Sequence, residues 1–366
     1  MLSDLDSARS PFASRPGAVG DPPQHYGNPL GEQRALAEGK AVVDLSDRAV
    51  VTVSGPDRLS WLDSLTSQAL TKLQPGESAE TLLLDPTGRL QHAMRVVDDG
   101  ETTWLLVDGP EGAPLSAWLD RMRFMLRVEV ADRSAEFTTV GMLAPIELPG
   151  TVVAWIDPWN EVVAGGHQYA ASHPSAPWDY REVLVPVGTD LSELPAAGTL
   201  ALDALRIAAW RPRLSTEADE KTIPHELDWL RSAVHLAKGC YRGQETVAKV
   251  HNLGHPPRRL VMLHLDGSEG VLPVAGAAVV EPVPVVELVE TSPAKPVGHV
   301  TSSALHYELG PIALAVIKRS VDPAVDLVVE TDDGPIAAAQ EVIVPTDAGA
   351  SANVPRIPRL GAVKRG

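Results

Sequence analysis

The chain has 366 residues, of which 44% are hydrophobic and 22% are charged, so it is long enough for two or three soluble globular domains. Its formal net charge of −17 argues against a general binder of nucleic acid or membrane surfaces. A single cysteine excludes an internal disulfide framework and an iron–sulfur cluster held by cysteines of this chain alone. That cysteine usage fits a reducing compartment, and no apolar run approaches the ~20 residues of a membrane span. We therefore expect a cytoplasmic protein with no membrane contact.

The first 34 residues are rich in proline, glycine, serine and aspartate and show no hydrophobic periodicity. This composition predicts a flexible arm. A short helical turn is expected next, near residues 33–38.

The following segment predicts an α+β unit with antiparallel strands. Strands are indicated by β-branched and apolar runs, helices by apolar residues at helical spacing, and the breaks by proline and glycine. The predicted elements are a strand at 49–53, a helix that begins at 54–57 with Pro56 in its first turn, strands at 82–84, 90–97 and 103–107, and a helix at 114–123.

Residues 127–185 alternate short strands with turns and carry four large aromatic side chains: Trp155, Trp159, Trp178 and Tyr180. Two interpretations stay open at this point. The rings could line a flat ligand, or they could fill a small core that needs large side chains.

A helix is predicted at 199–209, and the stretch 223–227 leads into a further predicted helix at 226–231. Glu226 has two interpretations. Its carboxylate could bond a ligand that offers two donors side by side, or it could be a solvated residue in the first turn of a helix.

The only cysteine lies in the stretch Lys238-Gly239-Cys240-Tyr241-Arg242-Gly243-Gln244-Glu245. Two cations flank Cys240, and nearby positive charge favours the reactive thiolate. A lone cysteine is otherwise most often an inert small hydrophobic residue, but this window is polar and charged. The stretch therefore predicts an exposed, reactive thiol.

After residue 250, short strand candidates are separated by turn residues, which is typical of a small antiparallel barrel. The candidates are 260–265, 277–280, 297–301, 312–317, 326–330 and 341–344. Residues 281–296 contain four prolines and predict a protruding loop, and residues 346–366 predict a disordered tail.

The motif at 238–245 resembles the signature of the YgfZ branch of the YgfZ/GcvT folate-binding superfamily. The stretch 54–57 resembles that superfamily's strand-to-helix turn, and 83–89 resembles its hairpin. The resemblance implies an α+β fold of two ferredoxin-like units and a C-terminal antiparallel β-barrel around a central opening. The implied domains are a flexible arm (1–34), a folate-binding region of two α+β units (35–258), the barrel (259–345) and the tail (346–366).

The same resemblance implies a protein that binds tetrahydrofolate and supports the assembly or repair of iron–sulfur proteins, including enzymes that modify tRNA. We expect a monomer whose partners are a reduced folate and iron–sulfur client or assembly proteins, without direct nucleic-acid contact. Cys240 and Lys238 are the candidate catalytic residues, with the thiol at the rim of the folate pocket. The candidate folate-binding residues are Arg206, His225, Glu226, Lys238, Tyr241, Gln244 and Glu245.

The alternative is a tetrahydrofolate-dependent aminomethyltransferase, another branch of that superfamily. In that branch the hairpin is followed by paired aspartates, one of them catalytic, where this chain has His92 and Ala93, and a glutamate stands at the position of Ala208. Loss of these carboxylates counts against aminomethyl transfer. Ala208 belongs to the stretch 206–212, which resembles a further segment of that superfamily. In this segment Trp210 replaces the usual glycine. The sequence has no HExxH, CxxC or clustered aspartate pattern, so we expect no dedicated metal site.

Overall fold

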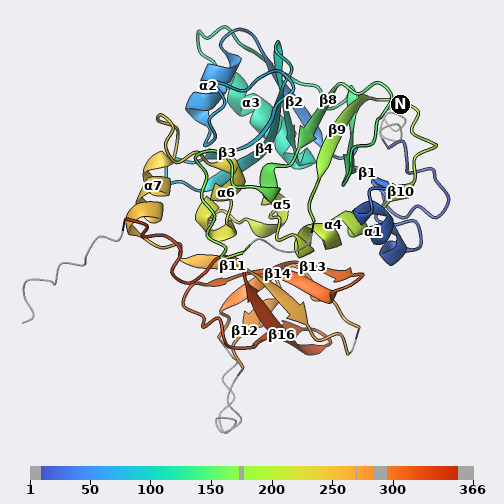
Figure 1. Cartoon of the computed structure of the whole chain (residues 1–366), viewed down its shortest axis with the longest axis vertical. Coiled ribbons are helices and arrows are strands. Elements are labelled where there is room, and N and C mark those ends of the chain that lie inside the picture. Colours follow the sequence, from blue (N-terminus) through green and yellow to red (C-terminus); the bar gives the residue numbers. More distant parts are fainter. Residues whose placement is uncertain (1–9, 173–176, 269, 283–294, 353–366) are drawn as a thin grey trace, which may run out of the picture.

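The computed structural model describes residues 10–172, 177–268, 270–282 and 295–352. Within these ranges the chain forms two five-stranded sheets and a closed barrel. Figure 1 shows the two sheets side by side, with the barrel packed beneath them. The α+β class with a C-terminal antiparallel barrel is confirmed.

The first sheet is antiparallel, with the order β3–β4–β5–β2–β6. Its strands are β2 (Ala49–Ser54), β3 (Ser78–Leu84), β4 (Leu90–Asp98), β5 (Thr102–Val107) and β6 (Glu129–Asp132). Helices α2 (Arg58–Leu65) and α3 (Gly112–Met122) bury Leu62 and Leu115 against one face of this sheet. The predicted strands at 49–53, 82–84, 90–97 and 103–107 are confirmed, while α2 begins after Pro56.

The second sheet has the order β10–β1–β7–β9–β8 and is antiparallel except for the β1–β10 pair. Its strands are β1 (Val42–Asp44), β7 (Phe137–Met142), β8 (Val153–Ile156), β9 (Arg181–Pro186) and β10 (Ala196–Ala197). The two sheets meet where Trp155 of β8 donates its indole N–H to the carbonyl of Ala79 on β3 at 2.8 Å.

The barrel consists of β11 (Arg258–Leu265), β12 (Ala278–Val280), β13 (Gly298–His306), β14 (Gly310–Lys318), β15 (Leu327–Thr331) and β16 (Gly334–Val342). Alternate residues of a strand point to opposite faces. In β11, Val261 and Leu263 fill the barrel interior, while Leu260 and Met262 join the core shared with the two sheets. Both faces are buried, which explains why β11 reads as a continuous apolar run.

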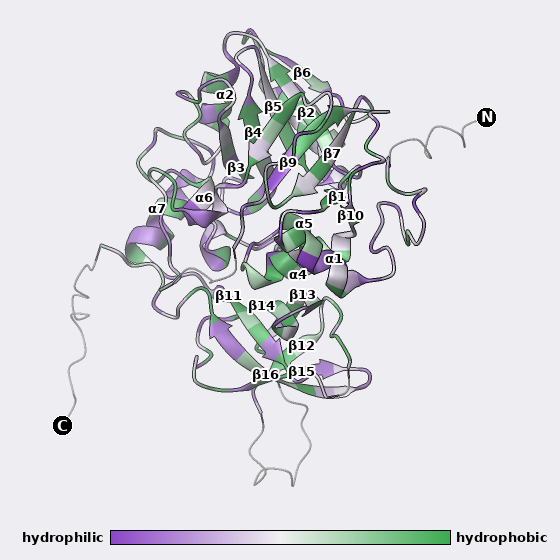
Figure 2. Cartoon of the chain, turned by 45° about the vertical axis from the view of Figure 1, so that its right-hand side comes forward, coloured by the Kyte–Doolittle hydropathy of each residue, from purple (hydrophilic) through white to green (hydrophobic). Residues whose placement is uncertain are grey.

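The remaining elements connect these bodies. They are α1 (Pro29–Ala37), α4 (Thr199–Ala208), α5 (Leu214–Glu217), α6 (Leu230–Ala233), α7 (Gln244–Leu253) and the short 3₁₀ helices η1 (Gly109–Glu111), η2 (Pro158–Asn160) and η3 (Pro224–Leu227). Figure 2 shows α4 as largely hydrophobic where it lies over barrel strands β13 and β14. No helix among the described residues has both the length and the apolar character needed to cross a bilayer.

The prediction of a flexible arm over residues 1–34 is wrong from residue 10 onwards. Phe12 is fully buried in a core with Val42 and Val140, and the Ser10 hydroxyl donates to the Asp44 carboxylate. The sequence did not reveal that Phe12 is buried, because a single aromatic side chain in a segment of low complexity gives no periodic signal. Residues 1–9 lie outside the described chain.

The structure also differs from, or does not cover, three further predictions, one in the middle of the chain and two near its C-terminus. The helix expected at 226–231 is broken, because Asp228 adopts a left-handed conformation (φ 54°) between η3 and α6. The last barrel strand is β16 rather than 341–344, since its alanine-rich sequence has few β-branched residues. Most of the loop at 281–296 and the tail from 353 lie outside the described residues, whereas the backbone N–H of Ser351 donates to the carbonyl of His251 on α7 at 2.9 Å.

Candidate functional site

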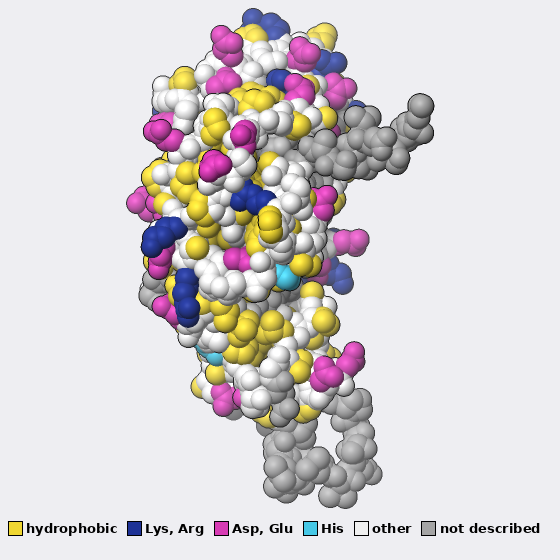
Figure 3. Space-filling model, turned by 90° about the vertical axis from the view of Figure 1, so that its right-hand side faces the viewer, with side chains coloured by type: hydrophobic (Ala, Val, Ile, Leu, Met, Phe, Trp, Pro, Cys, Tyr) yellow, Lys and Arg dark blue, Asp and Glu magenta, His cyan; other side chains and the backbone are white. Residues whose placement is uncertain are grey.

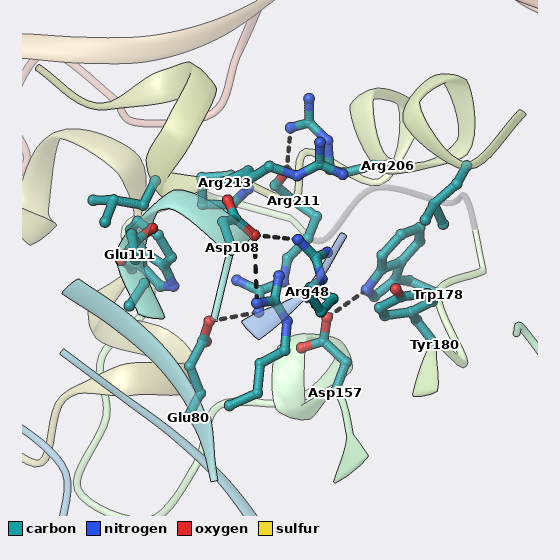
Figure 4. Close-up of a pocket in the computed structure, with 16 residues that line it drawn as sticks. Arg48, Glu80, Asp108, Glu111, Asp157, Trp178, Tyr180, Arg206, Arg211 and Arg213 are labelled. Atoms are coloured by element: carbon teal, nitrogen blue, oxygen red, sulfur yellow. Dashed lines mark hydrogen bonds and ion pairs between the residues drawn. The ribbon is translucent and has the colours of Figure 1, made fainter. Parts of the chain in front are cut away.

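A cavity with about 490 Å³ of empty space, its opening included, lies between the two sheets and the segment that follows α4. Figure 4 shows its charged side chains converging from several elements. The cavity is lined by Arg48, Glu80, Ala93, Arg95, Asp108, Glu111, Asp157, Trp178, Tyr180, Leu202, Arg206, Arg211, Pro212, Arg213, Leu214 and Trp229.

The two sheets and α4 place these residues. Ala93 and Arg95 are two residues apart on β4, so both face the cavity. Asp108 follows β5, and Arg211 and Arg213 follow the end of α4. The strands therefore supply the walls, and the segment after α4 closes one side.

One group of charges joins the sheets across the cavity. Arg48 contacts Asp108 and lies 3.2 Å from the Glu182 carboxylate, while Arg95 lies 3.1 Å from Glu182. Burial alone would raise the pKa of Asp108, but Arg48 and Arg95 hold it well below its ordinary value. The phenol of Tyr180 donates to Glu182 at 2.8 Å. Each buried charge of this group therefore has an opposite partner, which offsets the cost of removing it from water.

A second group is centred on Arg211. Its Nη2 lies 2.6 Å from Glu80, and its Nε lies 2.8 Å from Asp157. Burial would lower the pKa of this guanidinium, yet the two carboxylates raise it. Asp157 also accepts the indole N–H of Trp178 at 2.8 Å. Burial raises the pKa of Asp157 despite Arg211.

A third group ties the cavity to the barrel. Arg206 Nη1 lies 2.8 Å from the Glu217 carboxylate, which also accepts a hydrogen bond from Ser302 of β13 at 2.7 Å. Arg206 and Arg213 both pair with Asp203, at 3.3 and 3.1 Å. Every arginine of the cavity wall is thus matched by a carboxylate. A wall without excess charge suits a neutral, polar ligand better than an anion.

The structure bears out the core interpretation of the four aromatic residues of 127–185, and a role in lining a ligand stays a prediction. All four are buried, and Trp155 and Trp159 are fully enclosed in the core. Trp178 and Tyr180 also line the cavity, with their rings stacked at a centroid distance of 4.8 Å.

The Cys240 loop lies outside the cavity wall. Cys240 is exposed and precedes α7, and it is not among the residues that line the cavity. Lys238 Nζ donates to the carbonyls of Asp63, Thr66 and Gln68 at 2.5, 2.9 and 2.7 Å. Lys238 therefore holds the loop after α2, and no described hydrogen bond joins its ammonium to the thiol. The predicted activation of the Cys240 thiol by the nearby cations stays a prediction.

The loop nevertheless reaches the strand that carries the cavity wall. Arg242 donates to the side-chain oxygen of Gln91 on β4 at 3.0 Å and lies over Trp118 of α3. Gln91 and Ala93 are two residues apart, about 7 Å along the strand. Of the other predicted loop residues, Tyr241 is buried, Gln244 bonds the carbonyl of Lys238 at 3.4 Å, and Glu245 is exposed.

His225 and Glu226 lie in η3 and are fully buried. Glu226 pairs with Arg258 of β11 at 2.8 Å, so its carboxylate is neither solvated nor free. The Nε2 of His225 lies 3.0 Å from the carbonyl of Val247, and burial lowers its pKa to about 3. Neither residue lines the cavity; among the predicted folate-binding residues, Arg206 does. The assignment of these residues to a ligand stays a prediction.

Sequence reasoning missed most of the charged residues in the cavity wall. Glu80 and Arg95 of the wall, and Glu182 beside it, each lie in a strand next to an apolar run, and a charge beside such a run was the available signal. Because their partners are distant in sequence, no local pattern connects them. Among the described residues, no group of histidine, cysteine, aspartate or glutamate has an arrangement that could hold a metal.

The positions flagged by the hairpin comparison lie at this cavity. Ala93 lines it, and His92 beside it lies 3.1 Å from Glu111, which also lines it. Ala208 instead faces a separate groove between α4 and the barrel, together with Trp210 and Met262.

Two sheets that enclose a buried, charge-balanced cavity, together with a closed barrel packed beneath them, characterise the fold. A solved structure of the glycine cleavage system aminomethyltransferase T from Bartonella henselae has the same fold, with a TM-score of 0.67 over 92% of this chain and 96% of that chain, at 17% sequence identity.

No family model matches the chain. It is 27% identical to an aminomethyltransferase of a Nostoc species over 78% of this chain and 79% of the relative. It is 25% identical to a mitochondrial iron–sulfur cluster assembly factor homologue of Mycosarcoma maydis, over 59% of this chain and 55% of that protein. Sequence and fold together support a place in the GcvT-like aminomethyltransferase superfamily; the YgfZ branch stays a proposal.

Proposed function

We propose that this protein binds tetrahydrofolate in the central cavity and supports the assembly or repair of iron–sulfur proteins, rather than transferring an aminomethyl group. The observation that carries the proposal is Ala93 in the cavity wall. Where the transferase branch is expected to have a carboxylate, this chain offers a methyl group, which can neither position nor accept a proton.

The side chains of the cavity wall are of the kinds that suit the pteridine head of a reduced folate. Its charges are paired, and the rings of Trp178 and Tyr180 can pack against a flat heterocycle. The indole N–H of Trp229 is one of several buried donors without a partner among the described residues, and the polar atoms of a ligand would supply the acceptors. When bound, tetrahydrofolate would supply one-carbon chemistry, while the chain's own residues bind and orient it.

The iron–sulfur part of the proposal rests on Cys240. Its thiol is exposed on a loop whose Arg242 contacts the strand of the cavity wall. An exposed thiol can lend a ligand to a cluster in transit or resolve an oxidised partner. The similarity to an iron–sulfur assembly factor homologue supports this function.

Two measurements test the proposal. Titration calorimetry with tetrahydrofolate should show binding, whereas p-aminobenzoylglutamate, which lacks the pteridine head, should not bind. In cells that lack the protein, Cys240→Ser should fail to restore iron–sulfur enzyme activity under oxidative stress while accumulating as a folded protein. Full restoration by that variant would reject the role of the thiol.

Aminomethyl transfer is the second candidate, favoured by the similarity to aminomethyltransferases. Asp108 and Glu111 place carboxylates in the same cavity as Ala93. The proton acceptor of this reaction would then be a carboxylate that follows β5, in place of the one missing from β4. Turnover of tetrahydrofolate with an aminomethyl-loaded carrier protein would establish this activity, and Asp108→Asn should then abolish it.

A further inference from the structure

The central cavity gathers hydrogen-bond donors that have no partner among the described residues. Most buried polar groups in proteins are bonded. Here the indole Nε1 of Trp229, Nη1 of Arg211 and Nε of Arg48 are buried without a hydrogen-bond partner, and all three residues line the cavity. Such a concentration calls for acceptors supplied by a ligand or by ordered water.

Arg211 cannot turn to satisfy its own free edge. Its Nε and Nη2 are engaged by Asp157 and Glu80, and the hydroxyl of Ser232 holds Glu80 at 2.6 Å. The guanidinium lies 5.0 Å from the ring centroid of Trp159. Nε and Nη2 of the guanidinium thus already donate, and its plane packs against Trp159. Nη1 remains as a donor that is held in a fixed position.

Trp229 lies beside this donor. The guanidinium carbon of Arg211 lies 5.9 Å from the Trp229 ring centroid, and Trp229 is 1% exposed. An indole N–H donates only, so it too needs an acceptor. The two donors belong to one wall of the cavity.

The surrounding charges decide what kind of acceptor fits. Arg211 is balanced by Glu80 and Asp157, so an anion placed here would meet two carboxylates. A neutral carbonyl oxygen has two lone pairs and no charge, and it can accept from both donors.

We propose that Trp229 Nε1 and Arg211 Nη1 form a donor pair that receives a neutral carbonyl oxygen on the ring of the cavity ligand. This rests on the proposed function, in which that oxygen is the 4-oxo group of a reduced pteridine. The pair would make the site selective for 4-oxo over 4-amino pteridines, because an amino group would bring donors against donors.

The test is a binding titration with tetrahydrofolate and with its 4-amino counterpart carrying the same tail. The unchanged protein should bind the 4-oxo ligand at least about tenfold more tightly, the usual scale for a buried donor left without its acceptor. Trp229→Phe should weaken tetrahydrofolate binding about tenfold and leave the 4-amino ligand nearly unaffected.

Trp210→Phe is the matched control. Trp210 is also buried with a free indole N–H, but it lines the groove between α4 and the barrel, so this variant should bind both ligands like the unchanged protein. Equal affinity of the unchanged protein for both ligands, or tetrahydrofolate binding untouched by Trp229→Phe, would overturn the donor pair and leave the proposed function standing. Failure of the unchanged protein to bind either ligand would overturn both. If Trp229→Phe does not fold, the comparison of the two ligands on the unchanged protein decides alone.

Discussion

Trp210 adopts a backbone conformation that side chains other than glycine rarely hold. Its φ is 56°, at the position where the superfamily motif has glycine, and its indole is 4% exposed. Ala209, which precedes it, caps the end of α4, and Trp210 makes the left-handed turn that leads the chain to Arg211. The packed indole offsets the strain of that turn.

Replacement of Trp210 by glycine and by alanine separates these two effects. Both variants lose the indole, so both should be less stable than the unchanged protein by about 3–5 kcal/mol. Trp210→Gly should be more stable than Trp210→Ala by about 1 kcal/mol, because alanine has a Cβ that destabilises a positive φ and glycine has none.

Urea denaturation measures that difference. Trp229, at φ −78°, is the control position, where the order should reverse and alanine should be the more stable replacement. Equal stability of the two Trp210 variants would show that the left-handed turn costs nothing.

At the scale of elements, the break between η3 and α6 shows how one residue redirects the chain. Asp228 takes the left-handed conformation, and its carboxylate accepts from the backbone N–H of Tyr169 at 2.6 Å. The other oxygen has no hydrogen-bond partner among the described residues and lies 3.9 Å from Arg231. Burial raises the pKa of Asp228 to about 7.

This raised pKa makes stability depend on pH with a defined sign. The unfolded carboxyl titrates near pH ~4, so the contribution of Asp228 is fully present below about pH 4 and is lost as pH rises through about 7. Asp228→Asn keeps the acceptor for Tyr169 and tolerates the left-handed conformation. It should therefore be more stable than the unchanged protein at pH 8.

Thermal unfolding from pH 4 to pH 8 checks this. The difference between the two proteins should grow by up to about 1.4 kcal/mol per pH unit across that window. A difference that is constant with pH would mean that Asp228 does not titrate there.

At the scale of the molecule, buried ion pairs join bodies that are far apart in sequence. Arg211 follows α4, Glu80 belongs to the first sheet, and Asp157 follows a strand of the second. Glu217 extends this connection to the barrel through Ser302. By contrast, Figure 3 shows acidic and basic side chains interspersed over the described residues of one outer face, without a broad basic area.

Arg211→Met should lower the free energy of unfolding by about 3–5 kcal/mol, because it leaves two buried carboxylates without their counter-charge. Combining it with Glu80→Gln and Asp157→Asn should restore part of the loss. Arg133→Met, which removes the exposed pair with Glu136, should leave the urea midpoint almost unchanged. A loss for Arg211→Met no greater than that control would show that the central pairs do not hold the sheets together.

Much of the architecture could be predicted from the sequence. The strands of the first sheet and most barrel strands follow from local apolar runs, and the motif at 238–245 pointed to a superfamily whose fold the structure shares. Cys240 was expected to be exposed, and it is. Its thiol was expected at the rim of the folate pocket, but Cys240 does not line the cavity, and the loop reaches the cavity strand β4 through Arg242 rather than through the thiol.

The cavity itself was decided by tertiary structure. Arg211 and Glu80 are 131 residues apart, and Arg48 and Glu182 are 134 apart, so no local window of the sequence contains either of these pairs. Hydrophobic periodicity is a local property, and by itself it located most strands of the first sheet and of the barrel. Which buried charges meet depends on how those elements pack, since a charge is tolerated in the interior only where the fold brings its partner.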